Sequence, residues 1–429
     1  MNTIASIKIW NYNVGAVLWN EQKNLGVFEF DKSFLDSNLN IAPIFAPIDT
    51  SNRNRTVFSF PFLNPETYKG LPGFLADSLP DKFGNQIIDV WLAQQGRDLQ
   101  SFNPVDRLCY IGKRGMGALE FEPETENYTS PSSVLEIENL VQFAKSILDN
   151  RADFHTNLNS EKGLMDIFQT GSSAGGARAK AIIAFNETTG EVRSGQIDDL
   201  VGFDYWLIKF DGITNQLLGD PLGYGKIEYA YYLMALDCGI SMMESRLMTE
   251  NGRSHFMTKR FDRKNNQKIH MQTLCGLAHF DYNLPGAHSY EQTFQIMRQL
   301  KLSFADMEQL FRRMVFNVLA RNQDDHTKNI SFLMNSSGNW SLSPAYDVTY
   351  AYNPTNFWLK SHQMSVNGKR DNINLEDLLL VGQSASIKKA KLIIEEVQNV
   401  LLNWKKYAQI AKMDNVQTNL IENKILKIM

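Results

Sequence analysis

The segment from Arg321 to Tyr352, RNQDDHTKNISFLMNSSGNWSLSPAYDVTYAY, constrains the fold of this chain more than any other. It places Asp324, Asn329 and Asp347 among apolar residues that we expect to be buried. Two carboxylates and an amide are poor core residues, but they are ligands of hard cations and acceptors of protons. Single Asp and Asn residues are also common in turns, so the hypothesis of a functional site depends on the three residues together.

A predicted hairpin lies between two of these residues. The sequences NISFLM and NWSLSPAYD are typical of strands, and NSSG is typical of the turn that joins them. Because a hairpin folds back on itself, we expect Asn329 and Asp347 to lie close together. Mg²⁺ binds few protein oxygens and takes its other ligands from water and substrate phosphates. The pattern therefore predicts a magnesium site that Asn329 and Asp347 share.

The first acid of the segment has a different expected role. Asp324 lies one loop before Asn329 and is placed to accept the proton of an attacking hydroxyl. This layout suits phosphoryl transfer, in which positioning and charge neutralisation carry most of the catalysis. Asp325 is the competing candidate for the base, but it lies four residues before Asn329 instead of five. We favour Asp324 and expect Asp325 to face solvent.

Residues upstream could supply the cation and the backbone donors that a nucleotide needs. Lys209 lies in the predicted strand WLIKF, where it either extends its amine to the surface or binds an anion. Glu228, in the first turn of the next predicted helix, could pair with Lys209. The loop GSSAGGARAK offers Gly175 and Gly176, whose N–H groups can turn toward phosphate, and Lys180 could add charge.

The predicted elements change in character along the chain. Residues 1–125 combine a strand meander with short helices, and residues 126–258 contain the glycine-rich loop and further strands. Residues 259–429 are mainly helical apart from the hairpin. The sequence therefore predicts an α+β protein with a small strand-rich lobe followed by a large helical lobe.

Composition limits the classes of function. The 429 residues carry a net charge of −4, which argues against a broad nucleic-acid-binding surface. Three cysteines without a CxxC motif fit reduced thiols. The N-terminus lacks the pattern of a signal peptide, and no apolar run reaches the roughly 18 residues of a membrane span. We therefore expect a cytoplasmic protein with no membrane contact.

Several motifs together resemble the HipA-type serine/threonine kinases of bacterial toxin–antitoxin systems. SSAGGARAK is similar to the family's glycine-rich loop, and RFDR at residues 260–263 is similar to its hinge. NQDDHTKNISF and PAYDV are similar to its catalytic and metal-binding segments, and MSVNGK at residues 364–369 also matches. The resemblance implies a two-lobed protein-kinase-like fold. Residues 1–125 would form an N-terminal subdomain, 126–258 the small lobe and 259–429 the large lobe.

The resemblance also implies roles for individual residues. Asp324 would be the catalytic base, and Asn329 and Asp347 would bind Mg²⁺. The residues implied in ATP binding are Gly175, Gly176, Ala177, Lys180, Lys209, Lys259, Arg260, Phe261, His326, Asn329 and Tyr346, with Glu228 as the helix partner of Lys209. Ser173 would match the family's autophosphorylated serine, whose modification inactivates the kinase, and Ser172 is the second choice.

The family's known activity leads to further expectations. Its members use ATP and Mg²⁺ to phosphorylate protein serines, in studied cases on aminoacyl-tRNA synthetases, and they act as toxins. They pair with a helix-turn-helix antitoxin that binds operator DNA, so this chain would contact DNA only through its partner. The chain departs from the family pattern at Arg178 and Ala179, which occupy positions that are often polar or acidic, and at Asp325, which replaces a small residue. These departures lie in the glycine-rich loop and in the loop of Asp324, and none of them removes a predicted catalytic group.

Two other functions remain open from the sequence. The loop DDHTKN is similar to the loops of lipid kinases, which favours a kinase of small molecules or lipids on the same fold. A non-catalytic co-repressor that keeps the fold for its antitoxin is the other alternative. The presence of Lys209 together with Asp324, Asn329 and Asp347 argues against the co-repressor, because a protein without catalysis has no need of all four.

Overall fold

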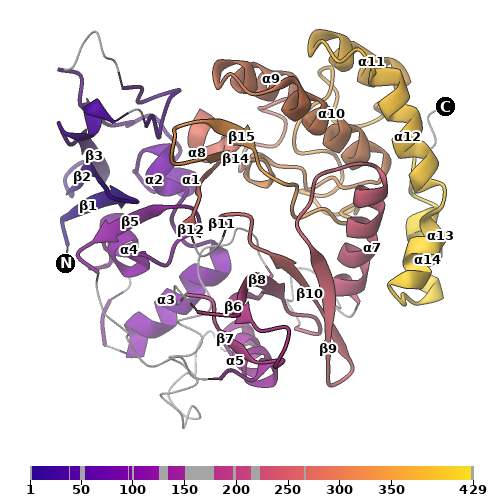
Figure 1. Ribbon diagram of the computed structural model, residues 1–429, viewed down its shortest axis with the longest axis horizontal. Helices are drawn as coiled ribbons and strands as arrows, with labels where there is room; N and C mark the ends of the chain where they lie inside the picture. Colours follow the sequence, from indigo (N-terminus) through magenta and orange to yellow (C-terminus); the bar gives the residue numbers. More distant parts are fainter. Residues whose placement is uncertain are drawn as a thin grey trace. The chain divides into compact units, whose positions relative to one another are not determined.

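The computed structural model groups the chain into two compact units. It describes residues 2–37, 39–48, 54–94, 96–98, 101–124, 134–149, 178–196, 200–213, 223–264 and 267–426. The first unit contains Met1–Leu39, Ile48–Gly225 and Glu244–Met271, and the second contains Asn40–Pro47, Lys226–Met243 and Gln272–Met429. The predicted domain boundaries after residues 125 and 258 stay predictions. Figure 1 colours the elements along the sequence.

The first unit opens with a five-stranded antiparallel sheet in the order β4-β3-β2-β1-β5. Its strands are β1 (Ile4–Ile9), β2 (Tyr12–Asn20), β3 (Leu25–Phe30), β4 (Val57–Phe58) and β5 (Leu119–Glu122). Buried and more exposed positions alternate along much of β1 and β2, and apolar residues such as Ile7, Ile9 and Val17 occupy the buried positions. Gly15 permits a close approach of β3, because a Cβ there would lie 2.0 Å from the carbonyl oxygen of Glu29.

Along the chain, the structure describes five helical segments between β3 and β5 of this sheet. They are η1 (Phe34–Asp36), α1 (Pro65–Tyr68), α2 (Gly73–Ala76), α3 (Lys82–Gln94) and α4 (Pro104–Ile111). The carboxylate of Asp81 accepts a hydrogen bond from the N–H of Gly84 at 2.7 Å and so caps α3. Asn103 and Asp106 form a reciprocal capping box at the start of α4.

A second antiparallel sheet in the same unit has the order β7-β6-β8-β10-β9. Its strands are β6 (Lys180–Phe185), β7 (Val192–Ser194), β8 (Asp204–Lys209), β9 (Ser245–Glu250) and β10 (Arg253–Lys259), and β11 (Arg263–Lys264) and β12 (Gln267–Lys268) form a small ribbon after it. A tight hairpin joins β9 to β10, and Asn251 and Gly252 at its turn both have positive φ, as the Asn-Gly pair favours.

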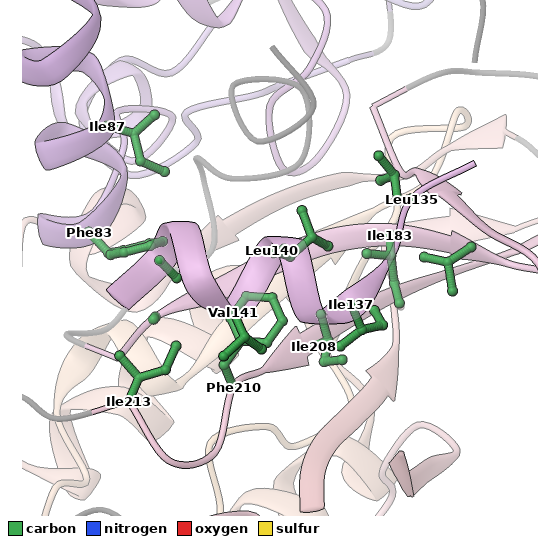
Figure 2. Close-up of a cluster of buried hydrophobic side chains, with 14 of the residues drawn as sticks. Phe83, Ile87, Leu135, Ile137, Leu140, Val141, Ile183, Ile208, Phe210 and Ile213 are labelled. Carbon is green, nitrogen blue, oxygen red and sulfur yellow. The ribbon is translucent and has the colours of Figure 1, made fainter. Parts of the chain in front are cut away.

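The hydrophobic core around the second sheet also includes helices from earlier in the chain. Phe83 and Ile87 of α3 and Leu140 of α5 (Ile137–Asp149) belong to one buried cluster with Ile183 and Ile208 of the strands. Figure 2 shows these side chains together. Each fully buried side chain of this kind contributes roughly 1.5–3 kcal/mol, so α3 and the second sheet are held together by a shared core.

The second unit is mainly helical. Its helices are α7 (Tyr224–Asp237), α8 (Leu274–Ala278), α9 (Tyr290–Gln299), α10 (Phe304–Leu319), η3 (Thr327–Asn329), α11 (Leu375–Ser384), α12 (Ala390–Leu401), α13 (Trp404–Ile410) and α14 (Asn415–Glu422), with α7 starting at the boundary between the units. A three-stranded sheet has the order β13-β14-β15, with β14 (Ser331–Met334) and β15 (Trp340–Leu342) in this unit and β13 (His270–Thr273) crossing the boundary between the units along the chain. The α+β fold class is therefore confirmed. No helix among the described residues combines the length and apolar character needed to cross a membrane.

One expected helix is divided. The sequence predicts a continuous amphipathic helix over residues 387–413, but α12 ends at Leu401 and α13 begins at Trp404. Trp404 is 1% exposed, its ring lies 5.7 Å from the ring of Tyr231, and its Nε1 donates to the carbonyl of Thr418 at 2.9 Å. Burial of this large side chain and its polar atom accompanies the break between the two helices.

Candidate active site

The loop that carries Asp324 is fixed to its surroundings where α10 ends. The backbone N–H of Ala351 donates to the carbonyl of Arg321 at 3.0 Å, and that of Gln323 donates to the carbonyl of Ala351 at 3.2 Å. Asn322 reaches back to α10, where its Nδ2 donates to Oδ1 of Asn317 at 2.9 Å. The start of the loop therefore has a defined conformation before the predicted catalytic residue.

A short 3₁₀ turn then orients the predicted metal ligand. The backbone N–H of Asn329 donates to the carbonyl of His326 at 2.8 Å, and its side-chain Nδ2 donates to the carbonyl of Asp324 at 2.8 Å. Because the amide nitrogen is used within the loop, the oxygen Oδ1 is the atom that a cation would use. Thr327 holds the turn from the other side, with its hydroxyl donating to the carbonyl of Phe280 at 2.6 Å.

The predicted hairpin is present and returns the chain to this loop. Phe332 of β14 pairs with Leu342 of β15, and the N–H of Ser343 donates to the carbonyl of Ser331 at 2.9 Å. Beyond β15, the hydroxyl of Tyr346 donates to the carbonyl of Lys328 at 2.6 Å. This bond ties the segment before Asp347 to the segment before Asn329.

These two segments line one pocket of the second unit. Asn329 and Asp347 lie in its wall together with His326 and Tyr346. Asp347 has the left-handed backbone conformation, with φ of 57°. The hairpin thus brings the amide and the acid to a common cavity, with the half-buried Asp324 in the adjoining loop. The binding of Mg²⁺ by this pair stays a prediction.

The neighbouring acid Asp325 does not face solvent, so the sequence-based expectation is wrong. It is 3% exposed and accepts three hydrogen bonds, from the hydroxyl of Tyr290 (2.9 Å), Nδ1 of His362 (2.9 Å) and the N–H of Gln363 (2.8 Å). Burial alone raises the pKa of this carboxyl, but the charge of His362 and the three hydrogen bonds hold the pKa below its ordinary value. Asp325 therefore anchors the loop to two distant segments.

Arg313 is a pocket residue that the sequence analysis missed. Its side chain lies on α10, is 7% exposed, lines the same pocket as Asn329 and Asp347, and donates through Nη2 to the carbonyl of Ser343. Burial lowers its pKa to about 10, so the guanidinium stays charged at neutral pH. An arginine within the apolar pattern FRRMVF was the available signal. Its positive charge favours anionic groups in the pocket.

The predicted nucleotide-binding lysines lie in the first unit. Lys209 ends β8, and its Nζ lies 6.0 Å from the ring centroid of Phe256. Lys180 begins β6 directly opposite Lys209, but its Nζ forms a buried ion pair with Asp81 at 2.7 Å. Glu228 is buried in α7 and belongs to the second unit, and its pairing with Lys209 stays a prediction.

Lys259 ends β10, and the predicted hinge, residues 260–263, follows it. Lys259 forms ion pairs with Asp204 at 2.9 Å and Glu244 at 2.8 Å. Arg260 is 4% exposed and its guanidinium contacts the carboxylate of Asp262. The side chain of Arg260 is therefore engaged inside the unit, and Phe261 between them is half-buried. An ATP contact from Arg260 would come from its backbone.

The predicted glycine-rich loop lies largely outside the described residues. This applies to Ser172, Ser173, Gly175, Gly176 and Ala177. Arg178 is the first described residue after them, and its guanidinium lies 3.7 Å from the ring centroid of Tyr224.

The donor set fits a magnesium ion that is shared with a nucleotide. Within the described part of the chain, no group of three or more His, Cys, Asp or Glu side chains is arranged to bind a metal. An amide oxygen from Asn329 and a carboxylate from Asp347 would leave most positions around the ion for water and phosphate oxygens, as Mg²⁺ requires. A site in which protein side chains supplied every ligand would leave no position for the phosphates.

Comparison with known families covers most of the chain. Residues 5–122 match the model of the HipA N-terminal domain, and residues 172–404 match the model of the HipA-like C-terminal domain. Two curated relatives are a "Putative kinase" of Haemophilus influenzae, 29% identical over 134 residues, and "Putative kinase Y4mE" of Sinorhizobium fredii, 27% identical over 157 residues. The matches cover 28% and 32% of this chain and 39% and 37% of the relatives. The matched part is therefore less than half the length of either relative.

A solved structure has a similar fold over nearly the whole length. It is a chain from the complex of the Shewanella oneidensis toxin–antitoxin proteins HipA and HipB with operator DNA. The TM-score is 0.67, the identity 16%, and the match covers 98% of this chain and 96% of the other. At this identity the likeness concerns the fold, and it supports the predicted two-lobed architecture.

Proposed function

This chain belongs to the HipA family, and from that premise we propose that it is an ATP- and Mg²⁺-dependent serine/threonine protein kinase. The observation that carries the proposal is the pocket in which Asn329 and Asp347 meet, beside the loop of Asp324. A carboxylate, an amide oxygen and a second carboxylate in this arrangement match the needs of phosphoryl transfer. The buried charge of Arg313 adds attraction for anions.

In the proposed reaction each residue has one task. Asp324 accepts the hydroxyl proton as the serine oxygen bonds to the γ-phosphorus, and the bond from that phosphorus to the bridging oxygen of ADP breaks. Asn329 and Asp347 would hold Mg²⁺, which neutralises charge on the phosphates when bound. Lys209, paired with Glu228, would contact the phosphates.

We propose that the protein acts as the toxin of a toxin–antitoxin pair in the cytoplasm. Its partner would be a helix-turn-helix antitoxin similar to HipB, through which it would meet operator DNA. The Shewanella complex, which contains HipA, HipB and DNA, supports this assignment. The protein substrate would be a translation component such as an aminoacyl-tRNA synthetase.

Autophosphorylation tests the proposed activity directly. After incubation of the full chain with Mg-ATP, we expect mass spectrometry to find phosphate on Ser173, or on Ser172 as the second choice. Ser173→Ala should remove a modification of Ser173, Ser172→Ala one of Ser172, and chelation of Mg²⁺ should prevent either. The matched control Ser194→Ala changes a buried serine of β7 and should leave the modification in place.

Two results would contradict the proposal. If calorimetry detects no binding of Mg-ATP and no protein in a bacterial lysate gains phosphate, the co-repressor alternative is correct. If phosphate appears only on a lipid or a small metabolite, the chain is a kinase of another substrate class.

A further inference from the structure

We infer that the N-terminal domain positions the adenine-binding segment of the kinase through the loop 113–117 and the buried carboxylate of Asp262. The inference rests on the proposed function, because it takes residues 259–261 as the segment that borders adenine. The segment begins with Lys259, the last residue of β10, and the N–H of Arg260 donates to the carbonyl of Tyr205 at 2.9 Å as the last bond to the sheet. Beyond this bond, the sheet itself no longer fixes the backbone.

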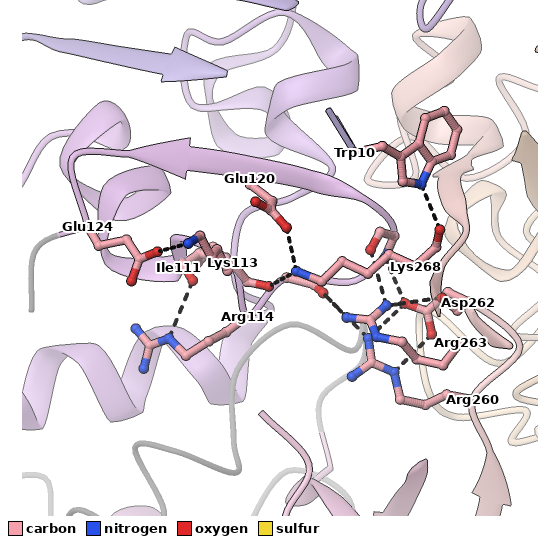
Figure 3. Close-up of polar contacts among 12 residues, drawn as sticks. Trp10, Ile111, Lys113, Arg114, Glu120, Glu124, Arg260, Asp262, Arg263 and Lys268 are labelled. Atoms are coloured by element: carbon pink, nitrogen blue, oxygen red, sulfur yellow. Dashed lines mark hydrogen bonds and ion pairs between the residues drawn. The ribbon is translucent and has the colours of Figure 1, made fainter. Parts of the chain in front are cut away.

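A buried charge network continues where the sheet ends. Asp262 is fully buried and accepts hydrogen bonds from Nε of Arg260 at 2.9 Å and Nη1 of Arg263 at 2.9 Å. The N–H of Gly117, from the N-terminal domain, also donates to this carboxylate at 2.7 Å. Figure 3 shows the carboxylate beside the two guanidinium groups, with bonds to both. One side chain of the predicted hinge thus binds a loop 145 residues earlier in the chain.

The two guanidinium groups bind the same loop. Arg263 donates through Nη1 to the carbonyl of Gly117 at 3.1 Å and through Nη2 to the carbonyl of Gly115 at 3.3 Å. Arg260 donates through Nη2 to the carbonyl of Gly115 at 3.4 Å. A planar guanidinium can hold two carbonyls and a carboxylate at fixed angles, which an ammonium cannot do.

The network acts as a unit because its charges are out of contact with water. Burial raises the pKa of Asp262, but the adjacent arginines and the N–H of Gly117 hold that pKa well below its ordinary value. A buried ion pair is strongly destabilised when one partner is removed, because the remaining charge is left uncompensated. A shift of the loop 113–117 would therefore displace the hinge with it.

Further contacts limit the movement of this loop and of the chain beside it. Gly117 has φ of 77°, and a Cβ there would lie 2.9 Å from the backbone nitrogen of Met271. Lys268 of β12 donates through Nζ to the carbonyl of Lys113 and to Oε1 of Glu120, each at 2.8 Å. The indole of Trp10 donates to the carbonyl of Lys268 at 2.8 Å. The chain on both sides of Asp262 is thus attached to the N-terminal domain (Figure 3).

The same domain also contacts the strand that follows the predicted glycine-rich loop. Asp81, which caps α3, forms the buried ion pair with Lys180 at the start of β6. Next to this pair, Phe83 and Ile87 of α3 share the core of the sheet with Ile183 (Figure 2). Lys180 at the start of β6 and the predicted hinge therefore both contact residues 5–122, which match the HipA N-terminal domain.

The substitution Arg263→Lys tests this positioning role. It keeps a positive charge beside Asp262 but loses the two-pronged bond to the carbonyls of Gly115 and Gly117. We expect the Kd for Mg-ATP, measured by calorimetry on the full chain, to rise about 10- to 100-fold, because small displacements of positioning groups have effects of this size. The Kd for Mg-tripolyphosphate, which has no adenine, should stay at the wild-type value. Arg193→Lys on β7 is the matched control, since Arg193 pairs with Glu191, and both affinities should be unchanged.

Each outcome of this experiment decides between the hypotheses. If Arg263→Lys is folded and binds Mg-ATP as the wild type does, or loses both affinities in parallel, the positioning role is wrong and the proposed kinase function stands. If the wild type binds neither ligand, the proposed function and the inference both fail. Should Arg263→Lys not fold, Lys268→Met, which removes the bonds from Nζ to Lys113 and Glu120, is measured by the same criteria.

Discussion

Asp324→Asn is expected to slow phosphoryl transfer severely while Mg-ATP binding persists. The carboxamide cannot accept the hydroxyl proton, and loss of a general base lowers the rate on the order of 10²- to 10⁴-fold. The substitution preserves the backbone carbonyl of residue 324, to which Nδ2 of Asn329 donates at 2.8 Å. The predicted metal ligand therefore keeps its orientation. Phosphate transfer from labelled ATP measures the rate, and calorimetry measures the affinity.

Asp371→Asn is the matched control for this experiment. Asp371 is an acid of the same unit whose side chain is 53% exposed and lies 3.8 Å from Arg321. The same change of charge at this position should leave the rate and the affinity at wild-type values. Near-normal transfer by Asp324→Asn would show that another group takes the proton. An equal loss of ATP binding would place Asp324 in nucleotide recognition instead.

Asp325→Ala is expected to lower the free energy of unfolding by about 3–5 kcal/mol, because it removes one partner of a buried pair. His362 and the hydroxyl of Tyr290 would lose the acceptor that they share, and the N–H of Gln363 would be left unbonded. Chemical denaturation of the full chain measures the loss. Asp324→Ala, at the neighbouring half-buried acid, should cost less than about 1 kcal/mol.

The free energy of unfolding that Asp325→Ala removes should depend on pH in one direction. The pKa of Asp325 is lower in the folded protein than its ordinary value of 3.8, so the folded state favours the carboxylate. The stabilisation is fully present above the unfolded pKa and is lost as the pH falls through the folded pKa. The difference between the wild type and Asp325→Ala should therefore shrink below pH 3.8. The anchoring role would be contradicted if the wild type and Asp325→Ala differed in free energy of unfolding by the same amount above and below pH 3.8. A loss below about 1 kcal/mol at neutral pH would also contradict it.

Local patterns explain which parts of the structure were predictable. The hairpin at Asn251 and Gly252 and the one between Asn329 and Asp347 follow from alternation and turn residues, which act over a few positions. Helices α9 and α10 follow from apolar periodicity and their capping boxes. The fold class and the return of the chain before Asp347 to the segment of Asn329 could be predicted for this reason.

Long-range contacts explain what the sequence could not indicate. Tyr290 and His362, which bury Asp325, lie 35 and 37 residues from it, and no local spacing indicates such partners. The ion-pair partner of Lys180 is Asp81, which lies just before α3 in the N-terminal region. The break between α12 and α13 likewise accompanies the burial of Trp404 against Tyr231, which lies far away in the chain. In each case a tertiary contact gives the residue a role that its neighbours in the sequence do not reveal.

A crystal structure with Mg²⁺ and a non-hydrolysable ATP analogue tests most directly whether Asn329 and Asp347 share one metal ion. We predict an ion about 2.0–2.1 Å from Oδ1 of Asn329 and from a carboxylate oxygen of Asp347, bridged to the phosphates, with Asp324 facing the γ-phosphate. An ion and nucleotide bound away from this pocket, or bound there without either side chain, would contradict the proposed mechanism.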